Sequence, residues 1–369
     1  MMSRNTRSWN TRRLGVRLVI AAVALAIVPG GVPPASAAGI GHAPGAASAR
    51  ASSAAGSPAR RAHRHRYLHA ASFNISGVLN DGTGRSHRSW QVRRKYVARE
   101  LLGQSPVAQR SARADVIALQ EANTSSRLRG GRTQYADLVH QLNHWTRGSN
   151  PYRAVKPGLH LNATRIAYNA HTLHLTKAGA FRWKAQELKA DGARMMAWAR
   201  FRLRSTGKRF FFASVHLETA SRNLRLRQWQ QLVHVVPRLA HGLPVVLGGD
   251  FNATRNHRHD TARQMLPVMR HAGFGDALGQ SGPGYLPVAK TRPGHVVNAR
   301  YGSLNHYRRH LAHYGSHAWV GQDVDYLFAS NRLRIMDWGM VADHRKGSDT
   351  LRGVIPSDHN MIRATVALR

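Results

Sequence analysis

The spacing of apolar residues predicts alternating strands and helices from residue 67 onward. Residues 67–75 (YLHAASFNI) and 115–119 (DVIAL) are short apolar runs typical of buried strands. Between them, apolar side chains recur at helical spacing before a glycine and a proline end the element, namely at Trp90, Tyr96, Val97 and Leu101. The first third of this region therefore predicts a strand, a helix and a second strand.

The middle of the chain predicts a hairpin followed by a helix. Residues 199–204 alternate apolar and Arg side chains, residues 205–208 (STGK) form a turn, and residues 209–217 (RFFFASVHL) return as a strand. The alternation favours a hairpin with one solvent-exposed face. The buried stripe of the next helix is expected at Trp229, Leu232, Val236 and Leu239.

The last part of the chain predicts further strands. Residues 245–249 (VVLGG) follow the helix, a later strand includes residues 327–328, and a final strand includes residues 361–366. No internal repeat at a fixed period is present. Because strands, hairpins and helices interleave throughout, we expect an α/β fold with mixed sheets.

The N-terminal residues have the pattern of an export signal. Five Arg side chains precede an apolar run over residues 18–28, which is too short for a comfortable membrane span, and residues 35–37 (ASA) have the form of a signal-peptidase site. We expect residues 1–37 to be a signal peptide and the protein to be secreted, with an uncleaved anchor as the alternative. Residues 38–66 are rich in Ala, Gly, Ser, Pro and Arg and predict a flexible linker. We expect residues 67–369 to form one domain and the protein to be monomeric.

Charge narrows the class of partner. The chain holds 55 Lys plus Arg against 17 Asp plus Glu. Residues 1–66 contain ten Arg and no acid, so the remainder keeps 45 − 17 = +28. Such a field attracts polyanions, including nucleic acid, anionic lipid and wall polymers. The absence of Cys excludes disulfides and thiolate zinc sites.

Six short segments end an apolar strand with a polar residue, and strand ends are where sites assemble in α/β folds. They are SFN (Asn74), ALQE (Glu121), SVH (His216), GGDFN (Asp250, Asn252), VDYLF (Asp325) and PSDHN (Asp358, His359). Carboxylate and amide oxygens suit a hard cation, Mg²⁺ or Mn²⁺, beside a phosphate ester. Taken singly, Asn74 could be a turn former, Glu121 or Asp250 a cap, and Asp325 a partner for an Arg. Their joint occurrence favours a site.

These segments, in this order, resemble the endonuclease/exonuclease/phosphatase superfamily, which includes exonuclease III-like and pancreatic-type deoxyribonucleases, neutral sphingomyelinases and inositol polyphosphate 5-phosphatases. The resemblance extends from residue 72 to residue 366, and LNATRIAYN and GFGDAL fit it as well. It implies a four-layer α/β/β/α sandwich, with two mixed sheets packed face to face and helices outside. No residue of the core set is missing, which favours an active enzyme.

The resemblance also implies roles by position. Glu121 would be the principal metal ligand, helped by Asn74 and Asp358. Asp250 would orient or deprotonate the attacking water and Asn252 would position it. His359 would contact the scissile phosphate with its ring held by Asp325, and His216 would bind a phosphate oxygen.

Three further charged residues are candidates for the site. Arg165 and Arg194 are candidates for contacting substrate phosphate, although a solvated face is the default for both in so basic a chain. Asp323 could be a second ligand, but we expect it to be an exposed acid.

We expect a secreted metal-dependent phosphodiesterase that hydrolyses DNA or RNA by in-line attack of water. The alternatives are a phosphodiesterase or phosphatase that acts on phospholipid or phosphoinositide, similar to sphingomyelinases, and a non-catalytic, basic polyanion-binding protein. The sequence lacks an amphipathic hairpin rich in Trp and Phe for membrane docking, which disfavours the lipid substrate.

Overall fold

The structure is a computed structural model. It describes residues 67–82, 86–104, 113–124, 127–146, 149, 151–156, 163–184, 194–255, 260–278, 296–312, 323–345 and 347–368. The expected signal peptide, its cleavage site and the linker all lie outside these residues. None of the helices in the described part of the chain is long and apolar enough to cross a membrane.

The first sheet contains seven strands in the order β10-β12-β13-β1-β2-β4-β3. At its centre β1 (Tyr67–Asn74) runs parallel to β2 (Val116–Gln120) and antiparallel to β13 (Met361–Leu368). Its other strands are β3 (Tyr152–Ala154), β4 (Arg165–Asn169), β10 (Val296–Val297) and β12 (Leu333–Val341). The sheet is therefore mixed.

The second sheet contains six strands in the order β5-β6-β7-β8-β11-β9 and is also mixed. Its centre repeats the arrangement of the first, because β7 (Arg209–His216) runs parallel to β8 (Val245–Asp250), which pairs antiparallel with β11 (Asp325–Ser330). The remaining strands are β5 (Leu173–Arg182), β6 (Met195–Leu203) and β9 (Phe274–Asp276).

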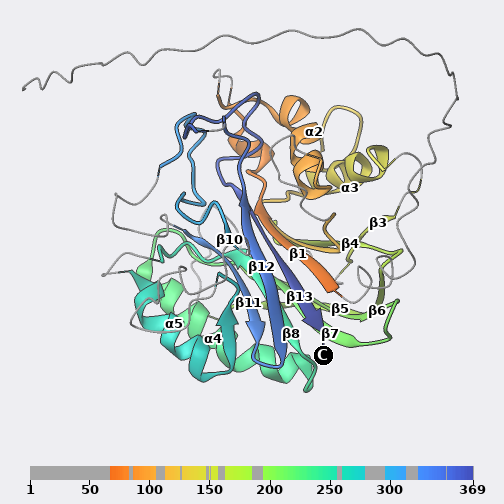
Figure 1. Cartoon of the computed structure of the whole chain (residues 1–369), viewed down its shortest axis with the longest axis vertical. Helices are drawn as coiled ribbons and strands as arrows, with labels where there is room; N and C mark the ends of the chain where they lie inside the picture. The colour runs from red at the N-terminus through yellow and green to blue at the C-terminus, as the bar shows by residue number, and fades with distance from the viewer. Residues whose placement is uncertain are drawn as a thin grey trace, which may run out of the picture. The chain divides into compact units, whose positions relative to one another are not determined.

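Helices cover the outer face of each sheet (Figure 1). The first sheet is covered by α2 (Trp90–Leu101) and α3 (Gln134–His144), and the second by α4 (Arg222–Ala240) and α5 (Thr261–His271). A short 3-10 helix (Val78–Asn80) follows β1. The predicted four-layer α/β/β/α sandwich is confirmed.

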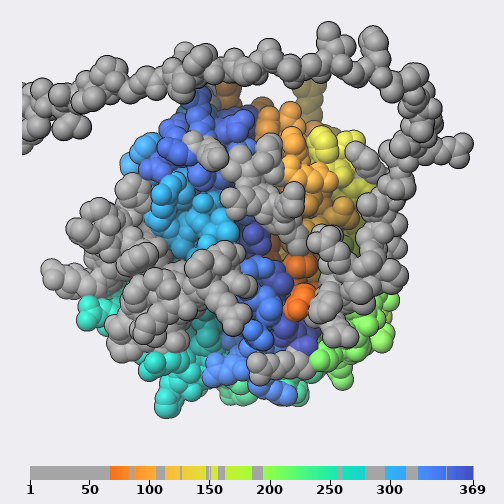
Figure 2. All heavy atoms as spheres, viewed as in Figure 1, coloured from red at the N-terminus to blue at the C-terminus, as the bar shows by residue number. Residues whose placement is uncertain are grey.

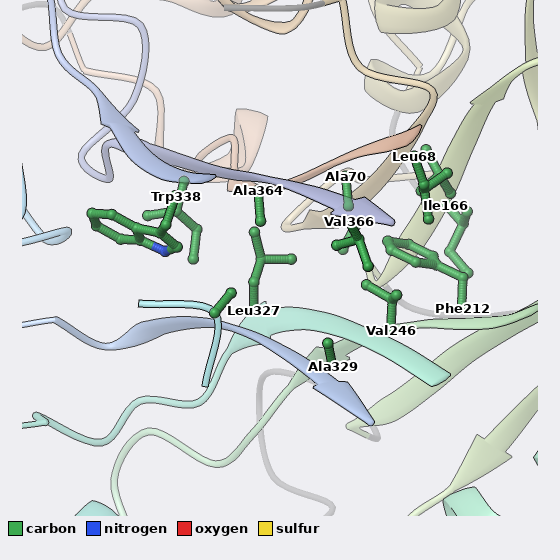
Figure 3. Packing of buried hydrophobic residues seen from close by; sticks show 14 of the residues in the cluster. Leu68, Ala70, Ile166, Phe212, Val246, Leu327, Ala329, Trp338, Ala364 and Val366 are labelled. Carbon is green, nitrogen blue, oxygen red and sulfur yellow. The ribbon is translucent and has the colours of Figure 1, made fainter. Parts of the chain in front are cut away.

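Apolar side chains fill the space between the two sheets (Figure 3). Leu68, Ala70 and Ile166 from the first sheet face Phe212, Val246 and Leu327 from the second, and all are at most 1% exposed. This layer fixes the two sheets against each other, so the strand ends at one edge of the sandwich are held at a constant separation.

The glycine pair before Asp250 permits close approach at two points. A Cβ at Gly248 would lie 2.8 Å from the Cβ of Ala118 in the opposite sheet. A Cβ at Gly249 would lie 2.4 Å from the carbonyl oxygen of Val215 on the neighbouring strand. Both distances are too short for real contacts, so this strand reaches the site only because it lacks side chains there.

The expectation of one solvent-exposed face on the hairpin was wrong. Every residue of β7 from Phe210 to His216 is buried, and only the end of β6 near the turn is exposed, at Arg202. The reason is that α4 covers the face of the hairpin that the alternating Arg side chains had predicted to be exposed to solvent. The other predicted strands and helices are confirmed with ends shifted by at most a few residues.

Candidate active site

Strand register places three predicted site residues side by side at one edge of the second sheet. His216 ends β7 and pairs with Asp250, which ends β8, and Asp250 in turn pairs with Asp325 at the start of β11. His216 Nε2 lies 3.6 Å from Asp250 Oδ2. The side chains form a row because the parallel and antiparallel neighbours of β8 meet it at the same residue.

The first sheet brings its residues to the same edge. Asn74 ends β1 opposite Gln120, Glu121 follows directly, and His359 precedes β13, which runs antiparallel to β1. The Asn74 amide joins the two sheets, because Nδ2 donates hydrogen bonds to Glu121 Oε1 at 3.0 Å and to Asp250 Oδ2 at 3.1 Å. The same nitrogen lies 3.5 Å from His359 Nε2. Four predicted residues therefore meet around one amide group.

Left-handed backbone conformations turn the chain at three positions around the site. Ser76, Glu121 and Asn252 have φ of 54°, 57° and 50°, which side-chain-bearing residues adopt rarely and at a cost of roughly 1–3 kcal/mol. Local hydrogen bonds hold these turns, since the Ser76 amide donates to Asn74 Oδ1 at 3.1 Å and the Asn252 amide to Asp250 Oδ1 at 2.8 Å. Asn74 and Asp250 are thus both turn residues and members of the site, so the two interpretations of each are compatible.

His359 is held as a cation between two carboxylates. Its Nδ1 lies 2.8 Å from Asp325 Oδ2, and its Nε2 lies 3.7 Å from Asp250 Oδ2. Burial by itself lowers the pKa of His359, but Asp325 and Asp250 outweigh it and hold the pKa well above its ordinary value. Burial raises the pKa of Asp250 to about 7, with His359 opposing and Asp325 reinforcing the shift.

His216 has the opposite electrostatic environment. Burial, followed by the positive charges of Arg194 and His359, lowers its pKa well below the ordinary value, so the imidazole is neutral. Arg194 Nη1 lies 2.9 Å from His216 Nδ1 and 3.0 Å from Nε2, and Arg194 Nη2 donates to Thr219 Oγ1 at 2.9 Å. Arg194, predicted from the sequence as a substrate contact, therefore lies at the site and touches one of its histidines.

The site can hold a divalent cation. One ligand atom from each of Asp250, Asp325 and His359 lies within 4.8 Å of the others. Asp325 Oδ1 is buried without a hydrogen-bond partner, which leaves an anionic oxygen uncompensated. The half-buried carboxylate of Glu121 adds further oxygen ligands next to Asn74. A donor set dominated by oxygen, with no sulfur, fits a hard cation.

Two predicted residues are less directly connected to this cluster. Asp358 is half-buried, and its Oδ1 accepts from Ser357 Oγ at 3.1 Å rather than from another predicted site residue. Arg165 is 6% exposed at the start of β4; its Nη2 donates to Thr124 Oγ1, and its guanidinium lies 5.8 Å from the Tyr135 ring centre. Arg165 is thus packed inside rather than on a solvated face.

Asp323 is fully buried, so the expectation of an exposed acid was wrong. Its Oδ2 lies 3.5 Å from Arg255 Nε, and Arg255 also pairs with Asp276 and lies 4.2 Å from the ring centre of Tyr326. Burial raises the pKa of Asp323 to about 7, with Arg255 opposing the shift. Asp323 belongs to a buried ion network behind the site.

The structure adds residues that the sequence interpretation missed. Arg93 is fully buried on α2 and donates to backbone carbonyls next to Asn74, while Gln134 Nε2 donates to the Ser76 carbonyl at 2.8 Å. Arg93 stands three residues after Trp90 and four before Val97, on the apolar stripe of its helix. A charged residue on a buried stripe was the available signal.

Comparisons with known proteins agree with this arrangement. A profile described as Endonuclease/Exonuclease/phosphatase family matches residues 71–359. No curated protein matches the sequence significantly. The fold resembles that of a mannosyl-6-phosphatase from Bacteroides thetaiotaomicron at 17% identity and a TM-score of 0.55, covering 81% of this chain and 99% of that one.

Two eukaryotic structures are similar as well. The human Nocturnin catalytic domain with bound sulfate is 16% identical with a TM-score of 0.52, covering 83% of this chain and 94% of that one. TDP2 from D. rerio, complexed with a single-strand DNA product, is 13% identical with a TM-score of 0.50, covering 81% and 98%. At these identities the likeness concerns the fold.

Proposed function

The chain belongs to the endonuclease/exonuclease/phosphatase family, and on that premise we propose that it is a metal-dependent phosphodiesterase that hydrolyses nucleic acid by in-line attack of water. The observation that carries the proposal is the position of Asp250. Its buried carboxylate lies between His216 and His359 and accepts from Asn74, which also binds Glu121. A proton acceptor, a cationic donor and oxygen ligands for a cation thus meet at one edge of the sandwich.

We assign the chemistry to the chain's own residues as follows. Asp250 takes the proton from the attacking water, and a pKa of about 7 suits a base near neutral pH. Asn252 donates Nδ2 to the Leu217 carbonyl at 3.0 Å, which fixes its amide beside that water. Protonated His359, with its ring held by Asp325, donates to a phosphate oxygen, and neutral His216 donates to another. Arg194 holds His216 and offers a second cation to the phosphate.

The cation is proposed to be Mg²⁺ or Mn²⁺, held by the carboxylates of Glu121 and Asp358, with Asn74 orienting Glu121 through Nδ2. We favour this position over the cluster of Asp250, Asp325 and His359 because Asp325 Oδ2 is already paired with His359 Nδ1 at 2.8 Å. Bound there, the cation would neutralise charge on the phosphate and stabilise the leaving oxygen. Arg165 is proposed as a further phosphate contact. It pairs across the sheet with Leu119, which stands two residues before Glu121.

The distribution of charge supports a polyanionic substrate. Every acidic residue except Glu187 and Asp191 is described, and each one is buried or half-buried. Exposed Arg residues, in contrast, lie on many different elements, including Arg202, Arg227, Arg263, Arg308 and Arg345. Among the described residues, exposed cations thus far outnumber exposed carboxylates, and mutual repulsion of these cations is relieved by a bound polyanion, so the charge favours nucleic acid over a small phosphomonoester. The DNA product bound to TDP2 is consistent with this substrate class.

A phospholipid substrate is less well supported. Within the described part of the chain, the exposed large hydrophobic residues are Leu79, Val92 and Val268, which lie on three different elements. Membrane-docking surfaces gather such residues into one patch. A phosphomonoester remains a candidate because the similar mannosyl-6-phosphatase structure carries that activity in its name.

One experiment separates these substrates. Purified protein is incubated with plasmid DNA, RNA, sphingomyelin vesicles and a simple phosphomonoester, with Mg²⁺ or with EDTA, at low and high salt. We expect cleavage of nucleic acid with Mg²⁺ only, weakening as salt screens the surface charge. Turnover of the phosphomonoester alone, or nucleic acid binding without any turnover, would overturn the proposal.

We further propose that the protein is exported and that residues 1–37 are removed. The support is the Arg-rich start, the apolar run of residues 18–28 and the small residues Ala35 and Ala37. Sequencing the N-terminus of protein recovered from the culture medium should give a chain starting at Ala38. Recovery of the uncleaved chain with the membrane fraction would contradict the proposal.

A further inference from the structure

Arg93 connects two segments of the chain that carry site residues but are far apart in sequence. It is fully buried on α2. One terminal nitrogen, Nη2, donates to the Ser76 carbonyl at 2.6 Å, and Nη1 donates to the Ile75 carbonyl and, at 3.2 Å, to the Pro356 carbonyl. Ile75 and Ser76 directly follow Asn74, and Pro356 stands two residues before Asp358.

The two segments lie beyond the ends of regular structure. Ser76 has a φ of 54°, and after β1 the ladder to β2 no longer holds the chain in register. The residues before β13 are likewise outside the strand. Backbone carbonyls there need donors, because buried carbonyls without partners cost free energy. The Arg93 guanidinium supplies donors to both segments at once, in a planar geometry that a single Lys ammonium does not reproduce.

The charge of Arg93 is compensated locally. Asp81 Oδ1 lies 2.9 Å from Nη2, and the guanidinium lies 5.2 Å from the centre of the Trp90 ring. The pair with Asp81 leaves little net field to act on a cation in the site. Arg93 therefore acts on the site through geometry, which sets it apart from Arg194.

A second tie runs between the same two segments. Ser357 Oγ donates to the Asn74 carbonyl at 2.6 Å, and Ser357 is fully buried. In the space-filling view, orange residues of α2 and blue residues from the last part of the chain appear on the same face (Figure 2). Asn74 and Asp358, which the proposed function places around the cation, are thus fixed relative to each other by Arg93 and Ser357.

We propose that Arg93 is a positioning residue that sets the separation between the Asn74 segment and the Asp358 segment and, through it, the affinity of the site for a divalent cation. This inference rests on the proposed function only for the location of the cation. Groups that orient metal ligands from behind are worth about 10–100-fold in metal affinity.

The test is Mn²⁺ binding by isothermal titration calorimetry on the full chain, with no substrate present. Arg93→Lys is expected to weaken Mn²⁺ binding about 10–100-fold. Arg94→Lys is the matched control, because Arg94 is the next residue on α2 and pairs with the buried Asp137 at 3.1 Å, away from both segments. Its Mn²⁺ affinity should equal that of the wild type.

Val97→Ala separates positioning from general loss of stability. Val97 is fully buried on the same helix and contacts neither segment through a hydrogen bond, so this variant should melt earlier and keep its Mn²⁺ affinity at temperatures where it is folded. Ser357→Ala removes the second tie with a smaller change and should also weaken Mn²⁺ binding, which keeps the proposal testable if Arg93→Lys does not fold.

Wild-type Mn²⁺ affinity in folded Arg93→Lys or in Ser357→Ala overturns the inference, as does an equal loss of affinity in Val97→Ala. Failure of the proposed function gives a different result. If the wild-type protein binds Mn²⁺ through these segments but cleaves no nucleic acid, the proposed substrate is wrong and the positioning role of Arg93 still holds.

Discussion

The two sheets supply the site in different ways. In the second sheet, His216, Asp250 and Asp325 are strand residues on neighbouring strands, and register alone sets them side by side. In the first sheet, Glu121 and Asp358 lie beyond the strand ends, on segments held by side-chain hydrogen bonds. The second sheet therefore builds its half of the site from backbone pairing, and the first builds its half from side-chain ties.

This difference matches a difference in the proposed chemistry. A proton acceptor and its neighbouring imidazoles need fixed distances, since proton transfer falls off steeply with separation, and a strand row provides them. A cation site needs several oxygens that close around an ion, and segments past the strand ends are able to do so. We expect variants in the second sheet to alter turnover first and variants in the first sheet to alter cation affinity first.

The largest effect is expected at Asp250. Asp250→Asn keeps the size of the side chain but removes the proton acceptor, so kcat should fall by about 10²–10⁴-fold, the usual contribution of acid–base catalysis. Binding of nucleic acid should persist, because the surface cations are untouched. Asp349→Asn, which alters a half-buried acid paired with Arg300, is the control and should keep wild-type kcat. Equal plasmid nicking by Asp250→Asn would remove Asp250 from the chemistry.

A smaller loss of turnover is expected at Asp325. Asp325→Asn removes the carboxylate that raises the pKa of His359 most, so this pKa should fall even though Asp250 still raises it. A larger share of the imidazole is then neutral, and kcat should fall roughly 100-fold. Because His359 regains its charge in acid, the ratio of variant to wild-type kcat should rise as the pH is lowered from 8 to 5. A ratio that is constant over this range would show that the charge of His359 is not involved.

The second-sheet row was predictable because it depends on local patterns. An apolar strand followed by a polar residue identifies His216 and Asp250, and their meeting follows once the strands pair in the family's order. The two glycines before Asp250 can also be read from the sequence. Why glycine is needed there, namely the close approach of Ala118 and Val215, is seen only in the tertiary structure.

The supporting contacts of the first sheet were not predictable from local patterns. Arg93, Ser357 and Gln134 act through hydrogen bonds to backbone carbonyls up to 283 residues away. No periodicity encodes such pairs, because the sequence separation is set by topology. The burial of Asp323 could not be predicted for the same reason. Its partner Arg255 is one of many Arg residues in the chain, and only the packing shows which Arg pairs with Asp323.

Glu121 tests which sheet holds the cation. Glu121→Gln removes a ligand charge and should weaken Mn²⁺ binding by at least about tenfold, since even groups that only orient ligands are worth 10–100-fold. Asp325→Asn should leave Mn²⁺ affinity close to that of the wild type. Calorimetric titration of both variants decides the matter. The reverse pattern would place the cation between Asp250, Asp325 and His359 and would assign both functions to the second sheet.

The smallest expected effect is a pH dependence of Mn²⁺ affinity, which would couple Asp250 of the second sheet to a cation held by the first sheet. In the cation-free protein burial raises the pKa of Asp250 to about 7, so below that pH its carboxyl carries a proton. A cation bound beside it favours the ionised form, and binding must then release that proton. Mn²⁺ affinity should therefore be nearly constant above pH 7 and fall by up to about tenfold per pH unit below it. Calorimetry in buffers of different ionisation enthalpy measures the released proton directly. In Asp250→Asn this group no longer titrates, so the Mn²⁺ affinity of the variant should depend less on pH. An unchanged pH dependence in that variant would assign the linked proton to a residue other than Asp250.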